Sequence, residues 1–230
     1  MRRAFATYTC DDAYVPGVVA LINSLRHHGN TSDIVVCITD DVTPGKKQEI
    51  EKLGAMCFVV QPVEYNGTQK CYLRAPVWKY LTKFGIWTLT HYDKVVYIDA
   101  DAIVRTNIES MFELPSVSAV LGESKQIGYQ GVETGVMVIT PSRNTYDALV
   151  GAAQSDTHDM RMADQSVIND FFYKHRKSHY MDDKYNRLWK KQELAGAWIY
   201  HFNANKPWND ATLRNADIWR QYYSLRCSVN

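Results

Sequence analysis

Three short apolar segments alternate with two helical patterns at the start of the chain, and this alternation restricts the fold more than any other feature. Residues 4–9, 34–39 and 56–60 are rich in β-branched and aromatic side chains, which is typical of strands. Residues 12–28 and 44–53 carry apolar side chains at helical spacing. Strands that alternate with helices form parallel sheets whose faces are covered by helices. The sequence therefore predicts an α/β fold, with a Rossmann-like, mostly parallel mixed sheet flanked by helices.

The chain lacks the glycine-rich phosphate loops of the commonest nucleotide-binding folds. No G-x-G-x-x-G follows the first predicted strand, and no G-x-x-x-x-G-K-[ST] occurs in the sequence. Those loops hold phosphates on backbone N–H groups at a helix N-terminus. A nucleotide bound by this chain must therefore be held by other groups.

Strands and helices are also predicted along the remainder of the chain, with no linker between them. Asp12 is expected to cap the first helix, because a side-chain oxygen there can accept a hydrogen bond from a free N–H group. Residues 122–131 are polar and contain glycine, which favours a loop. The other expected elements are strands at 94–101, 117–121 and 135–140, and helices at 75–89, 107–112, 142–149 and 163–173.

Composition excludes several classes of protein. The formal net charge of the 230 residues is +1, so no strong field favours nucleic acid or an anionic membrane. The sequence shows no signal peptide and no transmembrane segment, and we expect a cytoplasmic protein. The five cysteines are scattered without C-x-x-C spacing, which indicates reduced thiols and no zinc site or disulfide framework.

The predicted strand at 94–101 ends in two carboxylates, Asp99 and Asp101, separated by Ala100. A buried pair of carboxylates is costly, because both groups lose hydration and repel each other. A divalent cation such as Mg²⁺ or Mn²⁺ would compensate for both costs. Two solvated aspartates at a polar strand end are the alternative, and the spacing alone does not decide between them.

Other polar residues could complete such a site. His201 could be a further metal ligand or a core histidine, and Lys206 could hold a phosphate or lie in a solvated turn. Lys83 and Arg74 are cations on or beside one predicted helix, where they could contact an anion or serve a structural role. Asp164, followed by Gln165, could bind sugar hydroxyls or cap a helix.

Short motifs distributed from residue 4 to residue 208 together resemble a known family. The motifs occur in the family's order, and they are residues 7–14, 81–87, 97–101, 134–138, 164–165, His201 and 206–208. The chain resembles the glycogenin-like glycosyltransferases of glycosyltransferase family eight. The resemblance implies a single GT-A domain over residues 1–230. It would have a nucleotide-binding half at about 1–105, an acceptor half at about 106–210 and a helical tail at 211–230.

The resemblance also implies roles for individual residues. Asp99, Asp101 and His201 would bind Mn²⁺, which Mg²⁺ could replace. Catalytic roles would fall to Asp164, Gln165 and Lys206, with Asp164 as nucleophile or stabiliser of an oxocarbenium ion. The UDP-sugar would contact Tyr8, Cys10, Asp11, Tyr14, Arg74, Lys83, Ala100, Glu133, Thr134, Gly135, Asp164, Gln165 and Lys206.

The implied activity is a retaining, Mn²⁺-assisted transfer of a hexose from a UDP-sugar to an acceptor hydroxyl. UDP-glucose is the leading donor, with galactose, N-acetylglucosamine and xylose as alternatives. The acceptor could be a carbohydrate, a protein or a small polyol, and a homodimer is a possible assembly. A catalytically weak or inactive sugar-nucleotide or carbohydrate-binding protein is the alternative function, and a nucleotidyltransferase ranks third.

Two residues depart from the family's pattern where the donor sugar is expected. Glu133 replaces an amide that the family usually has, and Arg161 stands where the family often has an aspartate. An acid in place of an amide changes the hydrogen bonds offered to sugar hydroxyls. We therefore expect these two positions to decide the identity of the sugar.

Overall fold

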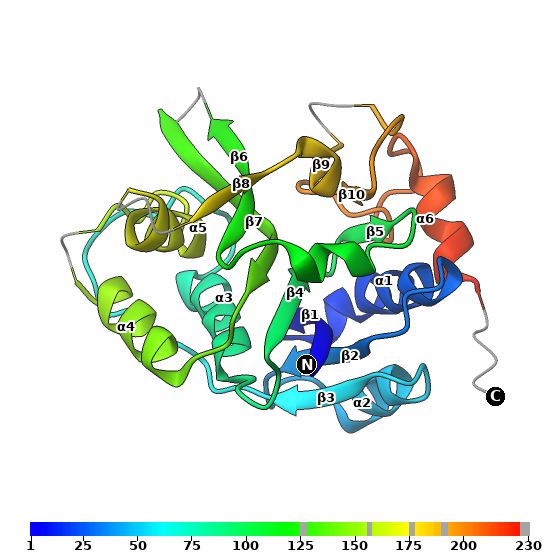
Figure 1. Ribbon diagram of the computed structural model, residues 1–230, viewed down its shortest axis with the longest axis horizontal. Coiled ribbons are helices and arrows are strands. Elements are labelled where there is room, and N and C mark those ends of the chain that lie inside the picture. Colours follow the sequence, from blue (N-terminus) through cyan, green and yellow to red (C-terminus); the bar gives the residue numbers. More distant parts are fainter. Residues whose placement is uncertain (125–127, 156–157, 175–177, 190–192, 226–230) are drawn as a thin grey trace.

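A seven-stranded sheet forms the centre of the molecule in the computed structural model (Figure 1). The structure describes residues 1–124, 128–155, 158–174, 178–189 and 193–225. The strand order is β3-β2-β1-β4-β7-β6-β8. The strands are β1 (Arg3–Thr9), β2 (Asp33–Ile38), β3 (Met56–Val59), β4 (Lys94–Ile98), β6 (Ser118–Ser124), β7 (Tyr129–Ile139) and β8 (His179–Met181).

Most neighbouring strands of this sheet are parallel. The pairs β1–β2, β1–β4, β2–β3 and β6–β8 are parallel, whereas β7 is antiparallel to both β4 and β6. Because β1 and β4 run side by side in the same direction, their carboxyl ends meet at one edge of the sheet. The prediction of a mostly parallel mixed sheet is confirmed.

Helices cover both faces of the sheet (Figure 1). Successive side chains of a strand point to opposite faces, so Val95 and Tyr97 belong to one buried cluster and Val96 and Ile98 to the other. The first cluster lies against α3 (Val77–Leu81), α4 (Arg143–Ala153) and α5 (Asp164–Ile168). The second lies against α1 (Val15–His27) and α2 (Pro44–Glu51).

A second, three-stranded sheet and the last helix adjoin α1. The order of this sheet is β5 (Ala102–Val104), β10 (Ile199–His201) and β9 (Arg187–Leu188). Helix α6 (Ala216–Tyr223) lies beside α1 (Figure 1), where Asn23 Nδ2 donates to the carbonyl oxygens of Tyr222 and Leu225, each at 2.9 Å. The predicted helical tail thus contains α6, and its residues 226–230 lie outside the described residues.

The region predicted as a loop at residues 122–131 is largely a hairpin, so that prediction was wrong. β6 extends to Ser124 and β7 begins at Tyr129, with Gly122 opposite Gly131. Exposed side chains such as Glu123 and Gln130 explain the polar sequence, because this part of the hairpin projects beyond the helical layers (Figure 1). Residues 125–127 of the predicted loop lie outside the described residues.

Three other local predictions need correction. The helix expected at 75–89 is α3 followed by a 3₁₀ helix over Thr82–Thr88, and the helix expected at 163–173 is α5 followed by a π-helical turn over Asn169–Tyr173. The capping residue near the first helix is Asp11, which accepts from Ala13 N. Asp12 instead accepts hydrogen bonds from the backbone N–H and the hydroxyl of Thr43. Among the described residues, no helix has the length and apolar character needed to cross a membrane.

Candidate active site

A cavity of about 580 Å³ opens at the carboxyl ends of β1 and β4. Ligands of α/β proteins commonly bind at this edge of the sheet. The structure brings every site residue predicted from the sequence to this cavity. They are Tyr8, Cys10, Asp11, Tyr14, Arg74, Lys83, Asp99, Ala100, Asp101, Glu133, Thr134, Gly135, Asp164, Gln165, His201 and Lys206. Their individual roles stay predictions.

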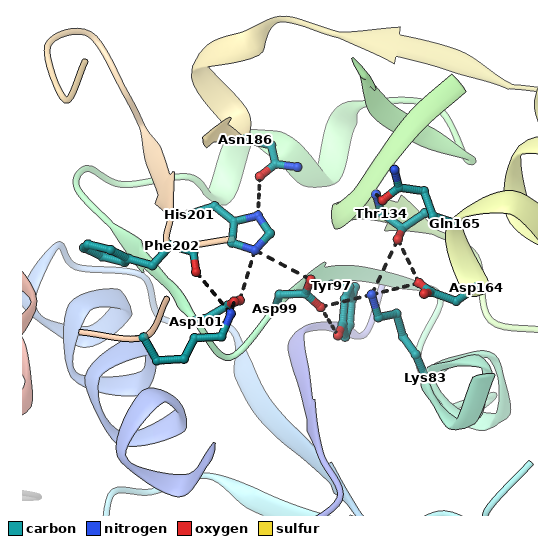
Figure 2. A network of polar contacts seen from close by, with 11 residues as sticks. Lys83, Tyr97, Asp99, Asp101, Thr134, Asp164, Gln165, Asn186, His201 and Phe202 are labelled. Atoms are coloured by element: carbon teal, nitrogen blue, oxygen red, sulfur yellow. Dashed lines mark hydrogen bonds and ion pairs between the residues drawn. The ribbon is translucent and has the colours of Figure 1, made fainter. Parts of the chain in front are cut away.

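Asp99, Asp101 and His201 form one compact group in this cavity (Figure 2). Each offers a ligand atom, and these atoms lie within 4.8 Å of one another. His201 Nε2 lies 3.0 Å from Asp101 Oδ1 and 3.8 Å from Asp99 Oδ2. Two carboxylates and an imidazole are suitable donors for Mn²⁺ or Mg²⁺, and a cation would relieve the repulsion between the carboxylates. The donor set therefore fits a divalent metal.

Backbone hydrogen bonds between neighbouring strands hold this group together. Asp99 N donates to Gly135 O at 2.7 Å, which anchors the end of β4 to β7. Phe202 N donates to Asp101 O at 2.9 Å, and the antiparallel pairing of β10 with β5 places His201 opposite Ala102. A residue that is distant in sequence is thereby fixed beside the two aspartates.

Gly135 provides room for the imidazole. A Cβ at Gly135 would lie 2.3 Å from His201 Cε1 and 3.1 Å from Asp99 Oδ2. Two carbon atoms that are not bonded to each other do not approach to 2.3 Å, so any side chain at this position would displace His201. Glycine at this position is therefore a steric requirement of the metal-ligand group.

Asn186 orients His201, and the sequence analysis did not identify it. Asn186 Oδ1 lies 2.9 Å from His201 Nδ1, and both side chains are buried. An amide oxygen there favours the tautomer with the proton on Nδ1, which leaves Nε2 free to bind a metal. No local pattern marks Asn186, because the contact depends on the parallel pairing of β9 with β10.

Lys206 Nζ forms an ion pair with Asp101 Oδ2, the carboxylate oxygen that does not face His201. Its Nζ also donates to Phe202 O at 3.1 Å and lies 5.7 Å from the centre of the Tyr14 ring. Burial alone would raise the pKa of Asp101, but Lys206 and His201 lower it well below the usual aspartate range. The carboxylate is therefore ionised at neutral pH, as a metal ligand must be.

A second polar network surrounds Lys83 (Figure 2). Its Nζ lies 2.9 Å from Asp164 Oδ2, 3.2 Å from Asp99 Oδ1 and 3.5 Å from Thr134 Oγ1. Thr134 Oγ1 also donates to Asp164 Oδ2 at 2.8 Å. Asp164 begins α5, but it makes no capping hydrogen bond there, so the capping alternative does not hold. The network joins Asp99, which follows β4, to the start of α5.

Burial and charge act in opposite directions on the pKa values of this network. Burial alone would lower the pKa of Lys83, but Asp164 and Asp99 raise it above the ordinary lysine value. Burial raises the pKa of Asp164, and Lys83 lowers it in part. Lys83 is therefore a fixed positive charge between two carboxylates.

Lys79 is a further cation at the cavity, and the sequence analysis missed it. Its Nζ lies 2.7 Å from Asp11 Oδ2, and the same oxygen lies 3.8 Å from Cys10 Sγ. Lys79 precedes Lys83 by four residues, and this helical spacing was the available signal. Charge at this end of the cavity is balanced by the ion pair.

Glu133 and Arg161 differ in their relation to the cavity. Glu133 is half-buried and lines it beside Thr134, whereas Arg161 is not among the described residues that line it. The Arg161 guanidinium instead binds Asp159, with Nη2 2.9 Å from Oδ2 and Nε 3.1 Å from Oδ1. Only Glu133 is placed to contact a ligand in the cavity.

Solved structures share this architecture. The apo form of the glycosyltransferase GlyE from Streptococcus pneumoniae TIGR4 aligns over 100% of this chain and 62% of its own, with a TM-score of 0.75 and 20% identity. The galactosyltransferase LgtC, solved with donor and acceptor sugar analogs, aligns over 100% of this chain and 98% of its own, with a TM-score of 0.64 and 14% identity. The GT-A fold is confirmed.

Curated relatives are longer than this chain. A UDP-glucuronate:xylan alpha-glucuronosyltransferase 1 of Arabidopsis thaliana is 30% identical over 90% of this chain and 32% of its own length. Human glycogenin-1 is 32% identical over 74% of this chain and 48% of its own length. The chain thus spans about a third of the first of these relatives and about half of the second.

A family model gives the assignment. The model described as glycosyl transferase family 8 matches residues 6–212, which include both polar networks of the cavity. The family match, the first relative and the GlyE structure each cover most of the chain. The chain belongs to glycosyl transferase family 8.

Proposed function

We propose that this chain is a retaining glycosyltransferase that transfers a hexose, with glucose as the leading candidate, from a UDP-sugar to an acceptor hydroxyl. The observation that carries the proposal is the juxtaposition of two networks in one cavity. Asp99, Asp101 and His201 form a metal-ligand group on one side, and Lys83 holds Asp164 on the other. Family membership supports the same reaction class.

The metal-ligand group would lie beside the diphosphate. Asp99, Asp101 and His201 would hold Mn²⁺, or Mg²⁺ in its place, and the ion would supply positive charge next to the departing diphosphate. Lys206 lies against Asp101 and would add a second positive charge that moves to the phosphate when UDP binds. Arg74 is exposed on the cavity wall and would contact the same diphosphate.

The sugar would lie against β7 and α5. Asp164 is held by Lys83 and Thr134 through Oδ2, so its carboxylate is fixed in one orientation. In the proposed reaction the bond from the anomeric carbon to the β-phosphate oxygen breaks, and a bond to the acceptor oxygen forms on the same face. The departing diphosphate takes the acceptor proton. Asp164 would stabilise the positive charge on the anomeric carbon, and Gln165 would bind sugar hydroxyls.

The uridine would occupy the end of the cavity near β1. Tyr8, Cys10, Asp11 and Tyr14 line this end, and the Asp11–Lys79 pair offers both acceptors and donors to a ribose. The division into a nucleotide-binding half and an acceptor half, which the resemblance implies, remains a prediction. The acceptor class, a homodimer and a cytoplasmic location likewise remain predictions from the sequence.

A donor screen tests the proposal. The protein is incubated with Mn²⁺ and each of UDP-glucose, UDP-galactose, UDP-N-acetylglucosamine, UDP-xylose and UDP-glucuronate, and released UDP is measured. We expect release from one donor to exceed the others and to fall by about 100-fold or more in Asp101→Asn, because a positioned metal contributes several kcal/mol. Asp40→Asn, an exposed aspartate, is the matched control. Tight binding of a UDP-sugar without any UDP release would instead indicate a binding protein.

A further inference from the structure

Asp99 differs from Asp101 in how its two carboxylate oxygens are used. Its Oδ1 accepts a hydrogen bond of 2.5 Å from the Tyr97 hydroxyl and lies 3.2 Å from Lys83 Nζ. Its Oδ2 faces His201 Nε2 at 3.8 Å. One oxygen is therefore bound by protein donors, and the other is directed toward the metal-ligand group.

The Tyr97 side chain contacts Asp99 from the buried cluster on one face of the sheet. The residue lies in β4, two positions before Asp99, and its ring is 1% exposed within the buried cluster under α3. Lys83 Nζ lies 5.4 Å from the centre of this ring (Figure 2). Because the ring is held within this cluster beside the cavity, the hydroxyl is held against Asp99 Oδ1, where it restrains the rotation of the carboxylate.

We propose that Tyr97 is a positioning residue that reserves Asp99 Oδ1 and so makes Asp99 a ligand through Oδ2 alone. The inference rests on the metal site of the proposed function and deepens it. Without the hydroxyl, Lys83 would remain the donor to Oδ1, but Lys83 is shared with Asp164, which is closer to it. The carboxylate could then rotate, and it would lose part of its orientation toward the ion.

The chain contains a matched control for this contact. Tyr92 is also buried, at 3% exposure, and its hydroxyl donates to Asp33 Oδ2 at 2.9 Å. Neither Tyr92 nor Asp33 lines the cavity formed by the described residues. Tyr97→Phe and Tyr92→Phe therefore remove the same chemical group from the same kind of hydrogen bond, and only the first is next to the metal ligands.

The test measures Mn²⁺ affinity by isothermal titration calorimetry in the presence of UDP, on wild-type protein and both variants. We expect Tyr97→Phe to weaken Mn²⁺ binding by about 10-fold, as the loss of an outer partner of a metal ligand typically does. Tyr92→Phe should leave the affinity unchanged. Equal Mn²⁺ affinities for wild type and Tyr97→Phe would overturn this inference but leave the proposed metal site standing. A wild-type protein that binds no Mn²⁺ would overturn the proposed metal site as well.

A second measurement does not depend on the folding of a variant. In wild-type protein labelled on its tyrosines, the Tyr97 hydroxyl proton should exchange slowly and give a downfield NMR signal, because it is buried and bound to a carboxylate. Addition of diamagnetic Mg²⁺ with UDP should leave this signal in place. Its loss on Mg²⁺ binding would show that the metal takes Oδ1, and it would overturn the inference.

Discussion

Lys83 Nζ lies 2.9 Å from Asp164 Oδ2, and these two side chains are among the least exposed charged groups of the described chain. Each compensates for the burial of the other. Asp99 is a second acceptor for the same lysine, so one positive charge serves two carboxylates. Removal of the lysine would leave an unpaired buried carboxylate, which is among the most destabilising changes that a single substitution can make.

Lys83→Met should therefore lower the free energy of unfolding by about 3–5 kcal/mol, measured by urea denaturation near neutral pH. Lys79→Met is the control, because Lys79 pairs with Asp11 in a setting where both side chains are 30% exposed. A pair exposed to that degree contributes only about 1 kcal/mol or less. If the two variants unfold at similar urea concentrations, the Lys83 network does not stabilise the fold as the contacts suggest.

The sheet and the carboxylate pair could be predicted because their signals are local. The alternation of strands and helices in the first sixty residues is visible in the sequence, and the carboxyl ends of parallel strands meet wherever such a sheet forms. Asp99 and Asp101 follow a strand directly, so their place at that edge needed no knowledge of tertiary contacts. His201 and Lys206 were candidates from the residues themselves, and the resemblance then gave them roles.

The supporting residues could not be predicted, because they depend on contacts between distant segments. Asn186 reaches His201 only through the pairing of β9 with β10, and the Tyr97 hydroxyl looks like ordinary core until the position of Asp99 is known. The hairpin of β6 and β7 was missed for another reason. Its strands leave the covered part of the sheet, so they lack the apolar pattern by which buried strands are recognised.

Gly17 allows α1 to approach the strand end that carries the aspartates. A Cβ at Gly17 would lie 2.4 Å from the carbonyl oxygen of Ala100 and 2.8 Å from the Trp208 ring. Gly17→Ala should therefore displace the turn between Asp99 and Asp101 and cost about 1–3 kcal/mol of stability through overpacking.

Gly151→Ala is the control for Gly17→Ala, because Gly151 lies inside α4, where an added Cβ would meet no atom within 4 Å. Alanine there should stabilise the protein by about 0.5–1 kcal/mol, since glycine is a poor helix former. Thermal unfolding of the two variants checks both signs. If Gly17→Ala were as stable as Gly151→Ala, then α1 could move away from the turn between Asp99 and Asp101 without loss of stability, and the expected overpacking would be absent.

Tyr92 should make stability depend on pH in the alkaline range. Burial and the neighbouring Asp33 raise the pKa of Tyr92 to about 12. Because the folded protein disfavours the phenolate, the contribution of Tyr92 is fully present below the unfolded pKa of about 10 and is lost as the pH rises through the folded pKa. Urea denaturation at about pH 8 and about pH 11 should show a larger loss of stability in wild type than in Tyr92→Phe. Parallel losses in the two proteins would contradict the assignment.

Glu133 should affect the choice of donor sugar, and Arg161 should not. The sequence marked both positions, but only Glu133 lines the described cavity, while Arg161 binds Asp159. A carboxylate accepts hydrogen bonds from sugar hydroxyls and donates none, so Glu133→Asn adds a donor where only acceptors were offered. The ratio of kcat/KM values for two UDP-sugars should then change by about 10-fold or more, since sites built on hydrogen bonds to hydroxyls discriminate strongly.

Arg161→Ala should leave that ratio unchanged. A change of selectivity in Arg161→Ala, with none in Glu133→Asn, would mean that the sugar lies nearer Asp159 than the cavity suggests.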